Sequence, residues 1–274
     1  MGRCPIYGRQ YMKESSKKYN LNSKQIRLLK LIFKFRFVTS TLLAKHLKLS
    51  SHVVVNHSLK ILLEQDYIGR SYKKSYRLQG KGARYYLAPK GLKYLRKEHG
   101  LNEKALHAFY KNKTVNQTFV DHCLDVFSAY IRLSSNTPDR FNIYSKYELH
   151  GLNYFPYPAP DLYLRRIVPS EDKPNDYFLD IFDSPLFYVI KKRFAQYVDH
   201  FDEGDWETKT KRGYPAMLLA CPNSYMENKL QVYTKDSLDD AGIDELDIYT
   251  TTVKALYKIT NQKAEIWHKV VISD

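Results

Sequence analysis

The stretch Tyr86-Leu87-Ala88-Pro89-Lys90-Gly91-Leu92-Lys93-Tyr94-Leu95 joins an aromatic, apolar run to a run with helical spacing. Proline suits the first turn of a helix, where the backbone N–H that it lacks has no partner within the helix. Pro89 therefore predicts the start of a helix over residues 90–99, and Gly100 is the type of residue that ends one.

The segment before this stretch predicts a β-hairpin. Residues 70–77 and 84–88 are rich in tyrosine and basic side chains, and Gly80 and Gly82 lie between them. Aromatic-rich runs on either side of a polar, glycine-bearing tip are typical of paired strands.

Three helices are predicted upstream of the hairpin. Residues 22–37 have apolar side chains at helical spacing, Thr39 or Ser40 can cap a second helix, and Ser50 or Ser51 can cap a third. Three helices, a hairpin and a helix follow one another in the order of a winged helix-turn-helix.

The quoted stretch also resembles the junction of wing and last helix in many bacterial DNA-binding winged helices, which reads Tyr-x-Leu-Thr-x-x-Gly-x-x-x-Leu. Ala88 stands where threonine is common. In such a fold the third helix reads the major groove and the wing contacts phosphates. The candidate contacts on the third helix are Ser51, His52, Asn56, His57 and Lys60, and those on the wing are Arg70, Lys73, Lys74, Arg77, Lys81 and Arg84.

Charge divides the chain into two parts. The net charge is +15, but residues 1–113 hold 26 basic and 5 acidic side chains, a net charge of +21, whereas residues 114–274 carry a net charge of −6. We therefore expect a basic arm over 1–20, a DNA-binding domain over 21–113 and a second domain over 114–274. The expected partner of the basic arm and of the DNA-binding domain is double-stranded DNA.

Composition also excludes several classes of protein. The mean hydropathy is −0.52, and no apolar run approaches the roughly 20 residues that span a bilayer, so we expect a cytoplasmic protein with no membrane contact. Three cysteines far apart in the sequence do not form a disulfide framework. His122 and Cys123 fall on a predicted amphipathic helix, where we expect them to be packed in the core.

Residues 114–274 predict an α/β fold. A helix over 114–133 is followed by three strands, a helix, a strand, a helix and a strand. This order, with Pro160-Asp161 opening the second strand and Asp180 in the third, resembles the PD-(D/E)XK restriction-endonuclease fold. The chain as a whole is thus expected to be a two-domain α/β protein whose second domain has a central mixed sheet.

The nuclease resemblance implies a site for Mg2+ or Mn2+ at Asp161 and Asp180, supplemented by Glu148. Such enzymes carry a lysine two residues after the second acid, but here that position is Phe182. Lys192, in the following helix, is the candidate replacement, with Lys191 and Arg193 beside it. Asp183 is expected on the opposite face of the strand from Asp180. The missing lysine favours an inactive domain, without cofactor.

The combined pattern, from about Leu21 to about Val253, resembles the replication-relaxation family of plasmids and other mobile elements. That family shows Glu-x-Asp in the third strand, and Asp180-Ile181-Phe182 keeps only the first acid. The resemblance implies a DNA-binding accessory protein of plasmid or mobile-element replication or relaxation. Its further partners would be a second copy of the chain and a replication or relaxase protein. The alternatives are a metal-dependent nickase that uses Asp161 and Asp180, and an adaptor that binds protein and not DNA.

Overall fold

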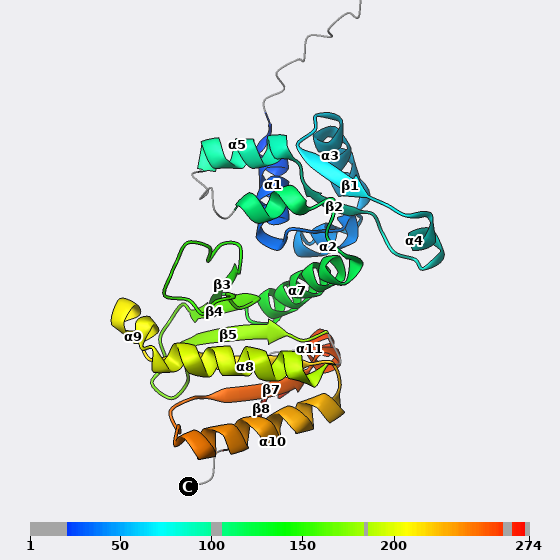
Figure 1. Cartoon of the computed structure of the whole chain (residues 1–274). Helices are drawn as coiled ribbons and strands as arrows, with labels where there is room; N and C mark the ends of the chain where they lie inside the picture. The colour runs from blue at the N-terminus through cyan, green and yellow to red at the C-terminus, as the bar shows by residue number, and fades with distance from the viewer. Residues whose placement is uncertain (1–20, 100–105, 184–185, 260–264, 272–274) are drawn as a thin grey trace, which may run out of the picture.

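The computed structural model describes residues 21–99, 106–183, 186–259 and 265–271 (Figure 1); the basic arm expected over 1–20 lies outside them. The three upstream helices are present as α1 (Ser23–Phe35), α2 (Ser40–His46) and α3 (Val53–Glu64). Local hydrogen bonds fix where the first two begin. Asn22 and Gln25 form a reciprocal capping box at α1, and Thr39 caps α2.

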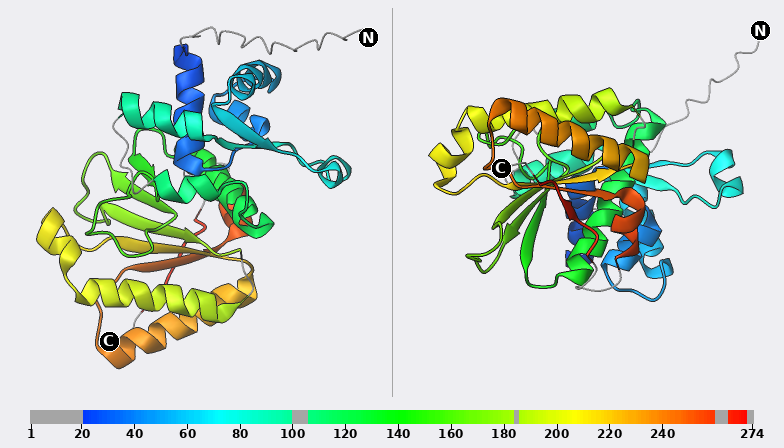
Figure 2. Two further views of the ribbon diagram at one scale, coloured as in Figure 1. Left: turned by 45° about the horizontal axis from the view of Figure 1, so that its top comes forward. Right: turned by 90° about the horizontal axis from the view of Figure 1, so that it is seen from below.

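The hairpin differs from the prediction. Strand β1 (Ile68–Ser71) pairs antiparallel with β2 (Arg84–Leu87), but the strand expected over 70–77 ends at Ser71. A short helix, α4 (Lys74–Leu78), forms between the two strands because Tyr76 turns inward and is buried. Figures 1 and 2 show that α4 extends away from the rest of the chain.

Helix α5 (Pro89–His99) begins at the proline, as predicted. The quoted stretch requires a glycine at position 91, because a Cβ atom there would lie 2.2 Å from the carbonyl oxygen of Tyr67. After α5, the 3-10 helix η1 (Ala108–Lys111) leads to the long helix α7 (Gln117–Asn136).

The second half is an α/β structure with a central mixed sheet, as predicted. Its strands lie in sequence order, antiparallel from β3 to β5, parallel from β5 to β7, and antiparallel again at β8. The strands are β3 (Phe141–Ser145), β4 (Leu162–Arg166), β5 (Asp176–Ile181), β6 (Ala216–Cys221), β7 (Ile248–Thr252) and β8 (His268–Lys269).

Helices cover both faces of the sheet (Figure 1). Helix α7 and the short α11 (Val253–Lys258) pack on one face, and α8 (Phe187–Asp202) and α10 (Ser224–Ala241) cover the other. Three short elements were not predicted from the sequence: α11, β8 and the helix α9 (Asp205–Thr210). None of the helices in the described ranges has the length and apolarity needed to cross a bilayer.

One hydrophobic core joins the two halves. Phe35 in α1 stacks on Phe127 in α7 with ring centroids 4.1 Å apart, and both rings are buried. The same cluster continues into the sheet through Leu179 and Leu218. Helix α7 is therefore packed between the basic N-terminal half and the sheet.

Candidate functional site

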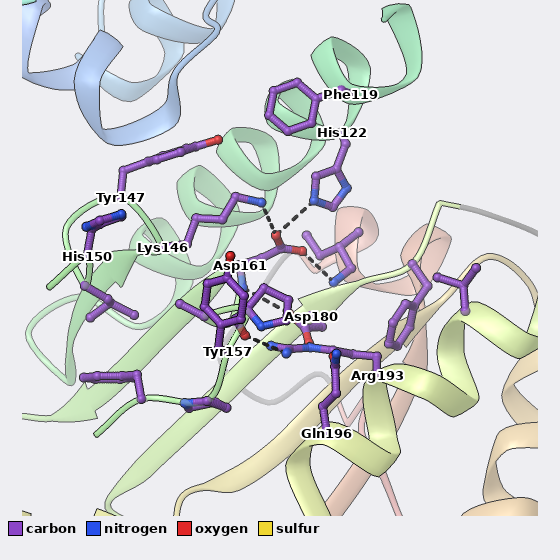
Figure 3. Close-up of a pocket in the computed structure, with 18 of the residues that line it drawn as sticks. Phe119, His122, Lys146, Tyr147, His150, Tyr157, Asp161, Asp180, Arg193 and Gln196 are labelled. Atoms are coloured by element: carbon purple, nitrogen blue, oxygen red, sulfur yellow. Dashed lines mark hydrogen bonds and ion pairs between the residues drawn. The ribbon is translucent and has the colours of Figure 1, made fainter. Parts of the chain in front are cut away.

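A pocket of about 1010 Å³ opens between the N-terminal part of α7, the segment that links β3 to β4, the end of β5 and helix α8. Its walls include the aromatic side chains of Phe119, Tyr147 and Tyr157 (Figure 3). Its floor holds Asp161 and Asp180, so the structure brings together the two acids that the sequence singled out.

Asp161 is surrounded by donors. Its Oδ1 accepts hydrogen bonds from Nζ of Lys146 at 3.0 Å and from Nε2 of His122 at 2.9 Å, and its Oδ2 accepts from the backbone N–H of Ile181 at 3.1 Å. Burial alone would raise the pKa of Asp161, but the two cationic neighbours hold this pKa well below its usual range. Asp161 is thus an ionised carboxylate whose charge is matched inside the protein.

Both carboxylate oxygens of Asp180 also accept hydrogen bonds. Its Oδ1 accepts from the backbone N–H of Asp161 at 3.0 Å, and its Oδ2 accepts from Nε of Arg193 and from the hydroxyl of Tyr197. Arg193 also donates to the carbonyl oxygen of Pro158 at 2.6 Å, which links α8 to the loop before β4. Figure 3 shows the two acids side by side with their separate cations.

His122 carries a proton in this arrangement. Burial disfavours its charge, but Asp161, by charge and hydrogen bond, raises the pKa of His122 to about 10, with help from Asp183. The Nδ1 atom of His122 lies 3.6 Å from Oδ2 of Asp183. The expectation that His122 is only a packing residue is therefore wrong, since its ring faces the pocket floor.

Asp183 also departs from expectation. It was expected on the face of the strand opposite Asp180, but β5 ends at Ile181, so strand alternation does not govern its direction. Its carboxylate faces His122, and this cationic neighbour lowers the pKa of Asp183.

Two predicted site residues lie apart from the acids. Glu148 accepts from the backbone N–H of Ser145 and pairs with Lys34 at 3.0 Å, so its carboxylate is held by the turn after β3 and by α1. Lys192 lines the pocket but is exposed. Its neighbour Arg193 makes the contact with Asp180 instead, because it lies on the buried side of α8.

The donor set does not suit a divalent metal. Mg2+ and Mn2+ need carboxylate oxygens that are free to coordinate, whereas the oxygens of Asp161 and Asp180 are all engaged by protein donors. Within the described ranges, no group of three or more His, Cys, Asp or Glu side chains is placed to hold a metal ion. A metal would have to displace Lys146, His122 or Arg193.

The predicted DNA contacts lie mostly on the surface. Asn56 is partly exposed, and the side chain of Arg77 lies outside the described residues. The exposed members of the set are Ser51, His52, His57, Lys60, Arg70, Lys73, Lys74 and Lys81.

Arg84 was expected among these surface contacts, and that expectation is wrong. Its side chain is only 2% exposed, its guanidinium lies over the ring of Tyr76, and its Nη2 donates to Asp121 of α7 at 2.7 Å. Tyr76 in turn donates to Gln117 of the same helix. The loop end of the hairpin is therefore bonded to α7, the helix that carries His122.

The structure is thus a mixed α/β protein with a basic, helical N-terminal half and an ion-paired pocket beside its sheet. Residues 29–146 match the family model described as Replication-relaxation, which confirms the family resemblance seen in the sequence. The match runs from α1 to the residue after β3, so Asp161 and Asp180 lie beyond it. Neither the curated proteins nor the solved structures gave a match.

Proposed function

We propose that this protein binds double-stranded DNA through α3 and the segment Ile68–Leu87, as an accessory protein in the replication or relaxation of plasmids or other mobile elements. The N-terminal half is proposed to be a winged helix-turn-helix, with α3 as the reading helix and α4 at the tip of the wing. The observation that carries the proposal is the set of exposed basic and polar side chains on these two elements, with a net charge of +21 over residues 1–113. Such a surface is expected to release counterions from a polyanion.

We further propose that the second half is a nuclease-like domain that does not cleave DNA. This follows from the charge balance on the pocket floor. Three cations, Lys146, His122 and Arg193, are hydrogen-bonded to the two acids. An acid pair neutralised in this way has little remaining attraction for a divalent cation. The pocket side of the molecule would instead serve self-association or binding of a replication or relaxase protein.

A salt titration with two matched variants tests DNA binding. The first variant reverses Lys73, Lys74 and Arg77 to Glu. The second reverses the exposed Lys209, Lys211 and Lys254, all in the second half, to Glu and changes the net charge equally. Fluorescence anisotropy on a labelled duplex should give a steep fall of affinity with salt for the unmodified protein. The first variant should bind far more weakly, with a log–log slope smaller by about 3, and the second should not.

The same preparation separates the alternatives. Failure to bind duplex at any salt would favour the adaptor that binds only protein and would overturn the proposal. Nicking of supercoiled plasmid with Mg2+ or Mn2+ that disappears in Asp161→Ala and in Asp180→Ala would favour the nickase. We expect DNA binding without nicking.

A further inference from the structure

Two valines at the start of α3 are exposed to solvent. The side chain of Val53 is 65% exposed and that of Val54 is 57% exposed, whereas the next valine, Val55, is buried. Valine also has a weaker helix propensity than most residues because its branched side chain loses rotamer freedom in a helix. Two exposed β-branched residues in the first turn therefore favour neither the solubility of the chain nor the helix.

Polar and basic side chains surround the two valines. At 100° per residue, Val53 lies in one stripe with His57 and Lys60, and both of these side chains are exposed. His52, also exposed, precedes Val53 directly. This face is therefore complementary to a partner that offers apolar groups beside negative charge.

The major groove of DNA offers this combination. Thymine places a C5-methyl group at the groove edge, apolar side chains contact that methyl, and phosphates flank the groove. The N-terminal residues of a reading helix are those that meet base edges. We propose that Val53 and Val54 contact thymine methyl groups, so that the DNA site of this protein contains thymine at the positions that face the first turn of α3. The inference rests on the proposed function and adds the base that the site recognises.

The test removes the methyl group from the DNA and leaves the protein unchanged. A duplex is selected from a random library with the unmodified protein, then synthesised once with thymine and once with deoxyuridine, which keeps the same base pairing and phosphates. Burial of one methyl group corresponds to about a fourfold change in affinity. We expect the deoxyuridine duplex to bind about sixteenfold more weakly if both valines make contact.

Protein variants assign the effect to these side chains. Val53→Ala/Val54→Ala should bind the thymine duplex about as weakly as the unmodified protein binds the deoxyuridine duplex, and should no longer distinguish the two. Val232→Ala, on α10, is the matched control because Val232 is 62% exposed, and it should distinguish the two duplexes fully.

The outcomes separate the inference from the proposed function. Absence of any duplex binding would overturn the proposed function. DNA binding without a selected site, or with equal affinity for the thymine and deoxyuridine duplexes, would overturn the methyl contact alone. An equal loss of affinity for both duplexes in the double alanine variant, or binding of the two valines to an acidic peptide in place of DNA, would also overturn it.

Discussion

Nζ of Lys146 lies 3.0 Å from Oδ1 of Asp161, although the two residues are 15 positions apart in the chain. The lysine expected two residues after Asp180 is missing, and the lysine directly after β3 reaches Asp161 instead. It forms an ion pair with one acid, and His122 binds the same oxygen. The pocket floor is therefore held together by a buried carboxylate and two partly buried cations.

Removal of Asp161 should destabilise the protein. Asp161→Ala removes a buried carboxylate and leaves the partly buried Lys146 and His122 without their shared partner, and loss of one member of a buried ion pair costs up to about 3 to 5 kcal/mol. Urea denaturation should show this loss, whereas Asp236→Asn, on an exposed part of α10, should change the unfolding free energy by less than about 0.5 kcal/mol. In an empty metal site made of unpaired carboxylates the effect would be the opposite, because removal of one carboxylate would relieve the repulsion between negative charges and stabilise the protein.

His122 should keep its proton well above neutral pH. Its pKa of about 10 in the folded chain exceeds its ordinary value of 6.5. Its contribution to stability is therefore complete below about pH 6.5 and is lost as the pH rises through about 10. The unfolding free energy should fall less steeply over this range in His122→Gln than in the unmodified protein. NMR titration of the ring should give a pKa near 10, and one close to 6.5 would contradict the ion pair with Asp161.

Divalent metal should not stabilise the fold. A ligand at a hundredfold excess over its Kd adds about 2.7 kcal/mol to the unfolding free energy. Because protein donors occupy the oxygens of Asp161 and Asp180, we expect the Tm to stay unchanged when Mg2+ or Mn2+ is added to 10 mM, a concentration of about 100 Kd for a site with Kd near 0.1 mM. A rise in Tm that is lost in Asp180→Asn would show that a metal ion displaces the protein cations from the two acids.

Arg84 should matter for stability and not for DNA contact. Its guanidinium is buried against Tyr76 and donates to the partly exposed Asp121, so Arg84→Ala should cost about 1.5 to 3 kcal/mol and shift the urea midpoint. The salt dependence of DNA binding, measured where the variant is folded, should keep its slope. A slope smaller by about 1 with unchanged stability would mean that Arg84 reaches a phosphate after all.

The two halves should unfold together. Phe127 is completely buried and stacks on Phe35 across the boundary between them, and Phe→Ala in a core costs about 3 to 5 kcal/mol. Phe127→Ala should lower the Tm of the whole chain in one transition. Near-ultraviolet and far-ultraviolet circular dichroism should report the same midpoint, whereas two separate midpoints would mean that the halves are independent domains.

The helices and most strands followed from patterns that are local in the sequence. Pro89 starts α5 because the first turn of a helix does not need its N–H, and Asn22 starts α1 through a cap that spans three residues. The hairpin was only partly predicted, since α4 depends on Tyr76 reaching Gln117, a residue 41 positions away. The closeness of Asp161 and Asp180 was implied by the resemblance to the nuclease fold, in which acids of the second and third strands share one site; here Asp161 directly precedes β4 and its backbone N–H donates to Asp180.

What the sequence alone determined is the order of elements, the concentration of positive charge in the first half and the identity of the two acids, because spacing, capping and composition act over short distances. What the tertiary structure decided is which charges meet. Three cations from separate parts of the chain, Lys146, His122 and Arg193, contact the acids. Arg84 is buried and pairs with Asp121. These ion pairs depend on how helices pack against the sheet, and a buried charge must find its partner wherever the fold places one.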